Sequence, residues 1–134
     1  MMLGKYGFIR VGEWMIKRGV KSGITFHLDS LMDDRVIYSF VVNKKAKYIG
    51  ICESINTHLI DRMARYKHMQ GAGTNERIAE LIRTALQDNK LVEIYALKPP
   101  SSDHYKGLNV DLVKGLENSL IAKIKKGWNI ANKQ

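Results

Sequence analysis

Two short runs of β-branched and aromatic residues, 36–42 and 48–52, stand on either side of the lysine-containing stretch 43–47. Such runs are typical of β-strands, and a polar stretch between them is typical of a turn. We therefore expect a β-hairpin in this part of the chain. A later run, residues 91–97, predicts a third strand of the same sheet.

The length of the turn sets the expected pairing within the hairpin. A five-residue turn pairs Val42 with Tyr48, which places Tyr38 opposite Cys52. Because side chains alternate between the two faces of a strand, Tyr38 and Tyr48 are then expected on the same face. A slip of one residue would put the two rings on opposite faces.

Apolar residues recur every three or four positions in three other segments, which predicts helices packed on the sheet. The first expected helix covers residues 55–69. The second starts from a cap at Thr74 or Asn75 and closes at Asp88. The third runs from about residue 110 to residue 126, with Gly127 as C-cap. Two prolines in residues 98–103 predict a loop within the domain.

Residues 1–35 carry a weaker pattern. Residues 8–11 and 24–28 are typical of short strands, whereas residues 14–16 fit a strand or a helix. We expect this segment to be an extension packed against a core formed by residues 36–134. The length of 134 residues favours a single domain.

The charge of the chain points to a polyanionic partner. There are 22 lysine and arginine residues against 13 acidic residues, so the net charge is +9. No segment combines a dense basic face with an aromatic one, and no apolar run could span a membrane, so nucleic acid is favoured over a membrane. Cys52 is the only cysteine, which excludes an intrachain disulfide, and a cytoplasmic location is expected.

Glu117 falls on the apolar side of the last expected helix, in the arc of Leu116, Leu120 and Ile121. A buried glutamate needs a partner, and three interpretations remain open. The side chain reaches water at the margin, pairs with a structural arginine or lysine, or binds a divalent metal. Mg²⁺ prefers oxygen ligands and keeps most of its waters, so one carboxylate and a substrate phosphate suffice.

Several other residues suit either a structural or a chemical role. Tyr38 and Tyr48 fit sheet positions with buried rings, or the activation of water beside a phosphodiester, with Gly50 leaving room beside Tyr48. Arg62 fits a solvated helix position or a clamp on a phosphate oxygen. Asn129 fits a packed tail or the orientation of the glutamate or a water. Further candidates for proton transfer or phosphate contact are Tyr66, which suits the core, and His68, which suits the surface.

This ordered set of a tyrosine hairpin, a helical arginine, a late glutamate and a trailing asparagine resembles the GIY-YIG nuclease family. The first motif is residues 36–38, Val-Ile-Tyr, which departs from the family at its first position, and the second, residues 48–50, Tyr-Ile-Gly, is intact. Arg62 matches the family arginine, and Arg65 is a second candidate because the interval from the second motif is long. Tyr66 stands where some members have histidine.

The resemblance covers residues 36–130 and implies an α+β fold with a three-stranded antiparallel sheet flanked by helices. It implies an endonuclease of phage or restriction type that hydrolyses double-stranded DNA with Mg²⁺ or Mn²⁺. In that scheme Glu117 holds the metal, Tyr38 or Tyr48 activates water, and Arg62 grips the scissile phosphate.

One metal and one arginine per site are expected to cut one strand, so double-strand cleavage implies a dimer or tetramer. Basic residues that suit either DNA backbone contact or plain solvation are Lys44, Lys45, Lys47, Arg65, Arg77, Lys123, Lys125 and Lys126. The alternatives to an active nuclease are a catalytically inactive nucleic-acid-binding protein of the same fold and an unrelated interaction domain.

Overall fold

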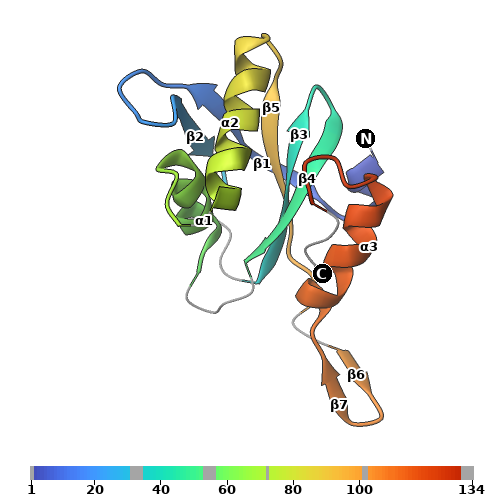
Figure 1. Cartoon of the computed structure of the whole chain (residues 1–134). Helices are drawn as coiled ribbons and strands as arrows, with labels where there is room; N and C mark the ends of the chain where they lie inside the picture. Colours follow the sequence, from blue (N-terminus) through green and yellow to red (C-terminus); the bar gives the residue numbers. More distant parts are fainter. Residues whose placement is uncertain (1, 31–34, 53–56, 72, 101–102, 131–134) are drawn as a thin grey trace.

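A five-stranded antiparallel sheet in the order β2-β1-β5-β3-β4 forms the centre of the molecule (Figure 1). The computed structural model describes residues 2–30, 35–52, 57–71, 73–100 and 103–130. The strands of the central sheet are β1 (Ile9–Ile16), β2 (Ile24–Leu28), β3 (Val36–Val42), β4 (Lys45–Cys52) and β5 (Val92–Leu97).

The predicted α+β class is confirmed, but the expected three-stranded sheet is wrong, because β1 and β2 add two strands. β1 pairs with β5 along one edge and with β2 along the other. A bulge between Arg10 and Gly12 interrupts the first of these ladders, which explains why the alternation of β1 is hard to follow in the sequence. The boundary between an N-terminal extension and a core at residue 35 stays a prediction.

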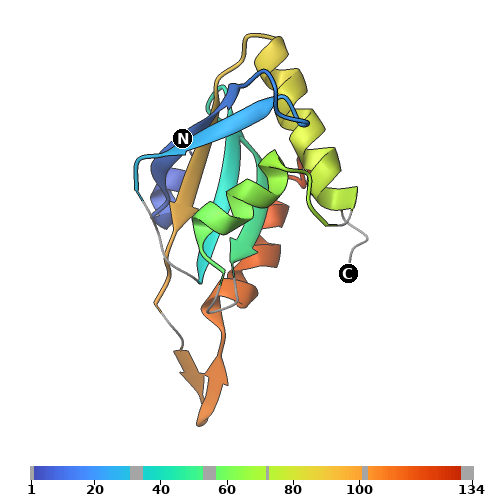
Figure 2. The same cartoon turned by 90° about the vertical axis from the view of Figure 1, so that its left-hand side faces the viewer.

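Helices cover both faces of the sheet, as Figure 2 shows with α1 and α2 in front and α3 behind. On one face lie α1 (Leu59–Lys67) and α2 (Gly73–Gln87), and on the other lie α3 (Leu112–Lys123) and the short 3₁₀ helix η1 (Met2–Tyr6). All seven residues of β3 are buried because both of its faces are covered. No helix within the described ranges has the length and apolar character that crossing a membrane requires.

The β3–β4 hairpin differs from the predicted register by two residues. Tyr38 pairs with Gly50 and Phe40 with Tyr48, because the turn is tight and a bulge follows Phe40. The turn residues Asn43 and Lys44 have positive φ angles of 46° and 69°, as a two-residue hairpin turn requires. A shift of two residues preserves the alternation of faces, so the prediction that Tyr38 and Tyr48 share a face is confirmed.

The C-terminal part contains a hairpin that the sequence pattern did not predict. Strands β6 (Asp103–Tyr105) and β7 (Leu108–Val110) form a separate two-stranded sheet that projects from the body (Figure 1). Helix α3 then begins after Asp111, whose side chain accepts a hydrogen bond from the Lys114 backbone, as an N-cap does.

Three predicted helix ends also change. Helix α2 already includes Gly73, so Thr74 and Asn75 lie within its first turn and neither is its cap. The first helix is shorter than expected and ends at Lys67, and its predicted start at residue 55 lies outside the described residues. The C-cap of α3 is Ile124 and not Gly127. Gly127 instead lies against the backbone of Lys47 on β4, where a Cβ atom would collide with the carbonyl group.

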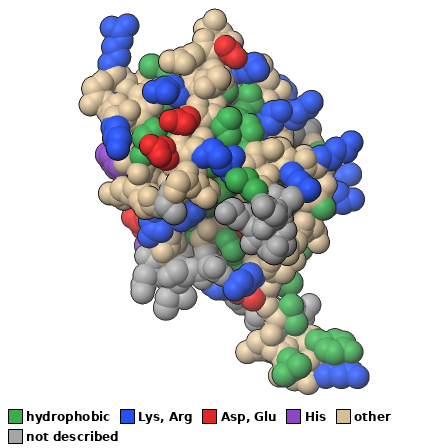
Figure 3. Space-filling model, viewed as in Figure 1, with side chains coloured by type: hydrophobic (Ala, Val, Ile, Leu, Met, Phe, Trp, Pro, Cys, Tyr) green, Lys and Arg blue, Asp and Glu red, His purple; other side chains and the backbone are tan. Residues whose placement is uncertain are grey.

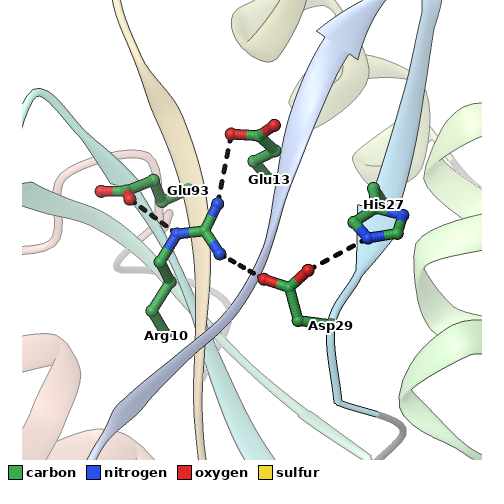
Figure 4. A network of polar contacts seen from close by, with 5 residues as sticks. All are labelled: Arg10, Glu13, His27, Asp29 and Glu93. Carbon is green, nitrogen blue, oxygen red and sulfur yellow. Dashed lines mark hydrogen bonds and ion pairs between the residues drawn. The ribbon is translucent and has the colours of Figure 1, made fainter.

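On the α3 side of the sheet, β1 and β5 carry an ion-pair network in place of a helix contact (Figure 4). Arg10 lies at its centre and contacts Glu93, Asp29 and Glu13, and His27 contacts Asp29. The hydrogen bond to Glu93 is the largest of the effects that raise the pKa of Arg10. Each charge in this network has a partner, so a structural role explains these charged residues.

Candidate active site

The candidate site lies along β4, the edge strand of the sheet, where the two helical layers meet. Two clefts share Tyr48 and Glu117 as lining residues. The arginine cleft, of about 420 Å³, is lined by Tyr48, Gly50, Ile51, Cys52, Thr57, Arg62, Arg65 and Glu117. The tail cleft, of about 710 Å³, is lined by Tyr48, Thr74, Arg77, Lys114, Glu117, Asn118, Ile121, Ala122, Lys126, Asn129 and Ile130.

Three phenols and a guanidinium form the inner wall of the site. The hydroxyl oxygens of Tyr38 and Tyr66 lie 2.6 Å apart, and Nη2 of Arg62 donates to them at 3.3 and 3.4 Å. The Arg62 guanidinium also lies 5.6 Å from the centre of the Tyr66 ring. Tyr48 stacks on Phe40 with ring centres 5.7 Å apart, which fixes its orientation. The predicted convergence of Tyr38, Tyr48 and Arg62 is therefore present.

The two tyrosines of the hairpin differ in their access to a ligand. Tyr38 is 0% exposed and lines neither cleft, whereas Tyr48 is 8% exposed and lines both. Tyr66 is fully buried as well, as expected of a core residue. Of the three phenols, Tyr48 is therefore the one positioned to meet a molecule bound in the clefts.

Gly50 serves a different purpose from the one expected. A Cβ atom at this position would overlap the ring and hydroxyl of Tyr38, which lies directly across the ladder. The glycine therefore makes room for Tyr38 and not for Tyr48. This close approach follows from the observed register, which pairs the two residues.

Burial is the main influence on the ionisation of the phenols. It raises the pKa of Tyr38, Tyr48 and Tyr66 above the usual value, and electrostatic repulsion between neighbouring phenols adds to this rise. Burial alone would lower the pKa of Arg62, but Tyr38 and Tyr66 outweigh it and the pKa is raised. At neutral pH the site therefore combines neutral phenols, which can donate hydrogen bonds, with a positively charged guanidinium.

Glu117 lies on α3 at the boundary between the two clefts and is half-buried. Among the residues that the structure describes, no three His, Cys, Asp or Glu side chains gather as a metal site. A magnesium ion that keeps its waters requires only one or two carboxylates together with substrate phosphate. The single carboxylate in an open cleft fits such an ion.

Asn129 binds the edge of β4 through both ends of its amide. Its Oδ1 accepts a hydrogen bond from Ile49 N at 3.0 Å, and its Nδ2 donates to Ile49 O at 2.9 Å. Trp128 N donates to Lys47 O beside it, so the tail pairs with the otherwise open edge of the sheet. Asn129 thus reaches the tail cleft as a residue that anchors the C-terminal segment, and its catalytic role stays a prediction.

The remaining predicted residues are distributed around the clefts. His68, at the C-terminal end of α1, is exposed and lines neither of them. Arg65 lines the arginine cleft, and Arg77 and Lys126 line the tail cleft. A third cleft of about 560 Å³ beside the β3–β4 turn is lined by the other candidates, Lys44, Lys45, Lys47, Lys123 and Lys125, together with Met2, Ala46, Ile124 and Gly127.

Lysine and arginine side chains are spread over the face of the molecule seen in Figure 3, with a dense group toward the side of α3. The structure adds Thr57, Thr74 and Lys114 to the cleft linings. These residues come from the ends of three different elements, and no spacing in the sequence connects them. Only their position around the edge strand identifies them.

Comparison with solved structures shows that this fold occurs in nucleases. A mutant of bacteriophage T4 EndoII superposes with a TM-score of 0.68 and 22% sequence identity, over 96% of this chain and 95% of that chain. The restriction endonuclease HPY188I in complex with product DNA superposes with a TM-score of 0.57 and 21% identity, over 99% of this chain and 84% of that chain. No family model and no curated protein sequence matches the chain.

Proposed function

We propose that this protein is a metal-dependent endonuclease of GIY-YIG type, of the phage or restriction kind, that hydrolyses double-stranded DNA. The observation that carries the proposal is the meeting of Tyr48, Arg62 and Glu117 around two adjoining clefts at the edge of β4. Two further observations support it. The fold is shared with two nucleases, one of them solved with DNA, and the chain carries a net charge of +9.

Glu117 would hold Mg²⁺ or Mn²⁺ in the clefts. When bound there, the ion supplies neutralisation of phosphate charge and stabilisation of the leaving 3′ oxygen. Glu117 suits this role because it is a half-buried carboxylate that lines both clefts from helix α3.

Arg62 is the residue proposed to bind the scissile phosphate. It lines the arginine cleft with Tyr48 and Glu117, and its hydrogen bonds to the phenols are long, at 3.3 and 3.4 Å. Donors engaged so weakly remain available for a phosphate oxygen. A guanidinium already held in place stabilises the charge that grows as phosphorus becomes five-coordinate.

Tyr48 is the phenol proposed to contact the attacking water. Tyr48 lines both clefts and its hydroxyl hydrogen-bonds with Tyr66, whereas Tyr38 lines neither cleft and its hydroxyl is enclosed by Tyr66 and Arg62. Because burial raises its pKa, Tyr48 enters the reaction as a neutral hydrogen-bonding group. It orients water, and it becomes a proton acceptor only where a bound cation lowers that pKa.

Double-stranded DNA is the proposed substrate, with backbone phosphates held by the basic residues around the three clefts. One set of Tyr48, Arg62 and Glu117 per chain acts on one strand at a time. A dimer or tetramer is therefore proposed for double-strand cleavage. Light scattering measures the mass directly, and a nicked product that precedes the linear product indicates sequential cuts.

The deciding experiment incubates purified protein with supercoiled plasmid in Mg²⁺, in Mn²⁺ or in EDTA. Nicking or linearisation that requires metal supports the proposal. Glu117→Gln should abolish cutting and retain binding in a gel-shift assay, because the charge that holds the metal is lost while the basic residues remain. Glu80→Gln, at an exposed position on α2, is the matched control and should cut normally.

Two results would contradict the proposal. A gel shift without cutting under any metal condition would identify the catalytically inactive nucleic-acid-binding protein. Full cutting by Glu117→Gln in a preparation free of contaminating nuclease would remove the assigned metal ligand.

A further inference from the structure

The third cleft, beside the β3–β4 turn, is lined by five lysines, and we call it the lysine cleft. Three belong to the turn and the start of β4, and two to the end of α3 and the residues after it: Lys44, Lys45, Lys47, Lys123 and Lys125. Residues 35–52 and 118–134, which supply these lysines, contain no acidic residue. None of the five forms an ion pair with another residue that the structure describes. The cleft is therefore a concentration of positive charge that the described chain does not neutralise.

The two sides of the lysine cleft are fastened to each other. Trp128 N donates a hydrogen bond to Lys47 O, and Gly127 lies against the same carbonyl group, where a Cβ atom would not fit. Figure 1 shows the β3–β4 turn beside the C-terminal end of α3. Because the lysines of β4 and α3 are held on joined backbones, a ligand with several charges meets them without a large ordering cost.

Three lysines of this surface occupy backbone conformations that favour glycine. The φ angle is 69° at Lys44, 58° at Lys125 and 71° at Lys126, which lines the neighbouring tail cleft. A side chain is strained in this left-handed region, so lysine there costs stability that glycine would not. Such strain is typical of functional sites. All three strained positions add positive charge to the same surface.

Phosphate groups suit this cleft better than a second copy of the chain does. Two copies that met through this face would bring their lysines together, which like charges oppose. The acidic residues of the described chain also do not gather into a complementary face. Those on β1, on β5 and after β2 surround Arg10, those on α2 alternate with arginines, and Asp111 pairs with Arg35. A nucleic acid offers closely spaced negative charges and no positive ones.

Strand β4 places the lysine cleft on one side of the candidate active site. The lysines come first along the strand, Tyr48 follows, and Gly50 to Cys52 then line the arginine cleft. From Lys45 to Tyr48 the strand rises about 10 Å, which corresponds to about three nucleotides of one DNA strand. Beyond the other end of β4, residues 53–61 contain two acidic residues and no lysine or arginine. The two ends of β4 therefore differ in charge.

We propose that the lysine cleft holds backbone phosphates of the cut DNA strand about two to five nucleotides from the scissile bond, on one side of it only. The inference rests on the proposed function, since it requires the scissile phosphate beside Tyr48. It goes further by giving the bound strand a direction along β4. The protein grips the strand on the lysine side of the cut and leaves the other side largely free.

Neutral methylphosphonate linkages in the DNA test this arrangement. Cleavage positions are first mapped on plasmid DNA. Duplexes that span one site then carry a single neutral linkage in the cut strand, at successive positions up to about eight nucleotides on either side. Glu117→Gln protein binds each duplex in a gel-shift titration. Affinity is expected to fall roughly three- to eightfold at positions about two to five nucleotides away on one side, and to stay unchanged at the same distances on the other.

A charge-removing variant connects these positions to the lysine cleft. Lys45→Gln, Lys123→Gln and Lys125→Gln are combined in one protein, because glutamine removes the charge and keeps most of the side chain. Binding to unmodified DNA should weaken roughly 10- to 100-fold, and the slope of log affinity against log salt should flatten by about 3. The neutral linkages should then have no further effect, since both changes remove the same contacts.

The matched control removes three charges from the turn between β1 and β2, at the opposite edge of the sheet from β4. Lys17→Gln, Arg18→Gln and Lys21→Gln, all at exposed positions, change the net charge by the same amount. This protein should keep the one-sided pattern and lose less than about threefold in affinity. An equal loss in both triple variants would assign the effect to net charge and overturn the inference.

Three other results would also overturn it. The first is equal sensitivity to neutral linkages on both sides of the cut, or at no position. The second is a one-sided pattern that persists in the lysine-cleft variant, because the phosphates would then be held elsewhere. The third is a lower oligomeric mass of that variant in light scattering, because the cleft would then be an interface between copies of the chain. Metal-dependent plasmid cutting by the wild-type protein tests the proposed function separately, so the two failures are distinguishable.

Discussion

Gly50 lies directly across the β3–β4 ladder from Tyr38, and the tyrosine ring fills the space that any side chain at position 50 would need. The hydroxyl of that ring is in turn held by Tyr66 and Arg62. Tyr38 can therefore occupy the inner wall of the site only because position 50 is a glycine. Gly50 influences the position of Arg62 indirectly, through the hydrogen bond between Arg62 and Tyr38.

Gly50→Ala should lower the free energy of unfolding by about 1–3 kcal/mol, because the new methyl group overpacks a fully buried ring. Urea denaturation measures the change. Combining it with Tyr38→Ala should cost less than the sum of the two single changes, because the clash is gone. Gly115→Ala is the control, since a Cβ atom there meets nothing within 4 Å and alanine favours the helix. Equal losses at both glycines would contradict the steric explanation.

Tyr48→Phe and Tyr38→Phe should affect different properties. Removing the hydroxyl of Tyr48 is expected to slow DNA cleavage roughly 10²-fold and to cost up to about 1 kcal/mol of stability, because this hydroxyl also hydrogen-bonds with Tyr66. Removing the buried hydroxyl of Tyr38 takes one hydrogen bond from Tyr66 and one from Arg62, which keep only the long bond between them, and should cost about 1–2 kcal/mol of stability. Cleavage rates and urea denaturation of both variants provide the comparison. A larger loss of cleavage rate in Tyr38→Phe than in Tyr48→Phe would indicate that Tyr38, and not Tyr48, is the reacting phenol.

Asn129→Asp should detach the C-terminal segment from β4. A carboxylate cannot donate to Ile49 O and repels it, so a loss of about 1–3 kcal/mol in the free energy of unfolding is expected. Asn118→Asp places the same charge in the tail cleft from an exposed position and should change stability by less than about 0.5 kcal/mol. If both variants lose cleavage while neither loses stability, added charge in the cleft is the cause, and the anchoring role of Asn129 is wrong.

Asp111 should make stability depend on pH in the acid range. Its ion pair with Arg35 and the backbone hydrogen bond from Lys114 hold the pKa of Asp111 below its usual value. The stabilisation is therefore complete above the unfolded pKa of about 4 and disappears as pH falls through the lower, folded value. Asp111→Asn should cost about 0.5–1 kcal/mol at neutral pH, a small amount because the carboxylate is partly exposed, and nothing at the most acidic pH. Denaturation curves from neutral pH to about pH 3 measure this. A constant difference at every pH would exclude the ion pair as its source.

Local chemistry explains the parts of the fold that the sequence determined by itself. The apolar runs of β3, β4 and β5 and the three- and four-residue spacing of α1, α2 and α3 follow from the geometry of strands and helices. The shared face of Tyr38 and Tyr48 was also predictable, because it depends only on alternation. It survived an error of two residues in the register.

Tertiary structure decided which of these residues meet. The tight turn at Asn43 and Lys44 and the bulge after Phe40 set the register that places Gly50 against Tyr38. The position of β4 at the sheet edge brought α1 and α3 together around Tyr48, and the pairing of β1 with β5 enlarged the sheet. These outcomes depend on contacts between residues far apart in the chain, and such contacts leave no pattern in the local sequence. The pattern along the chain therefore specified the elements, and packing between them specified the site.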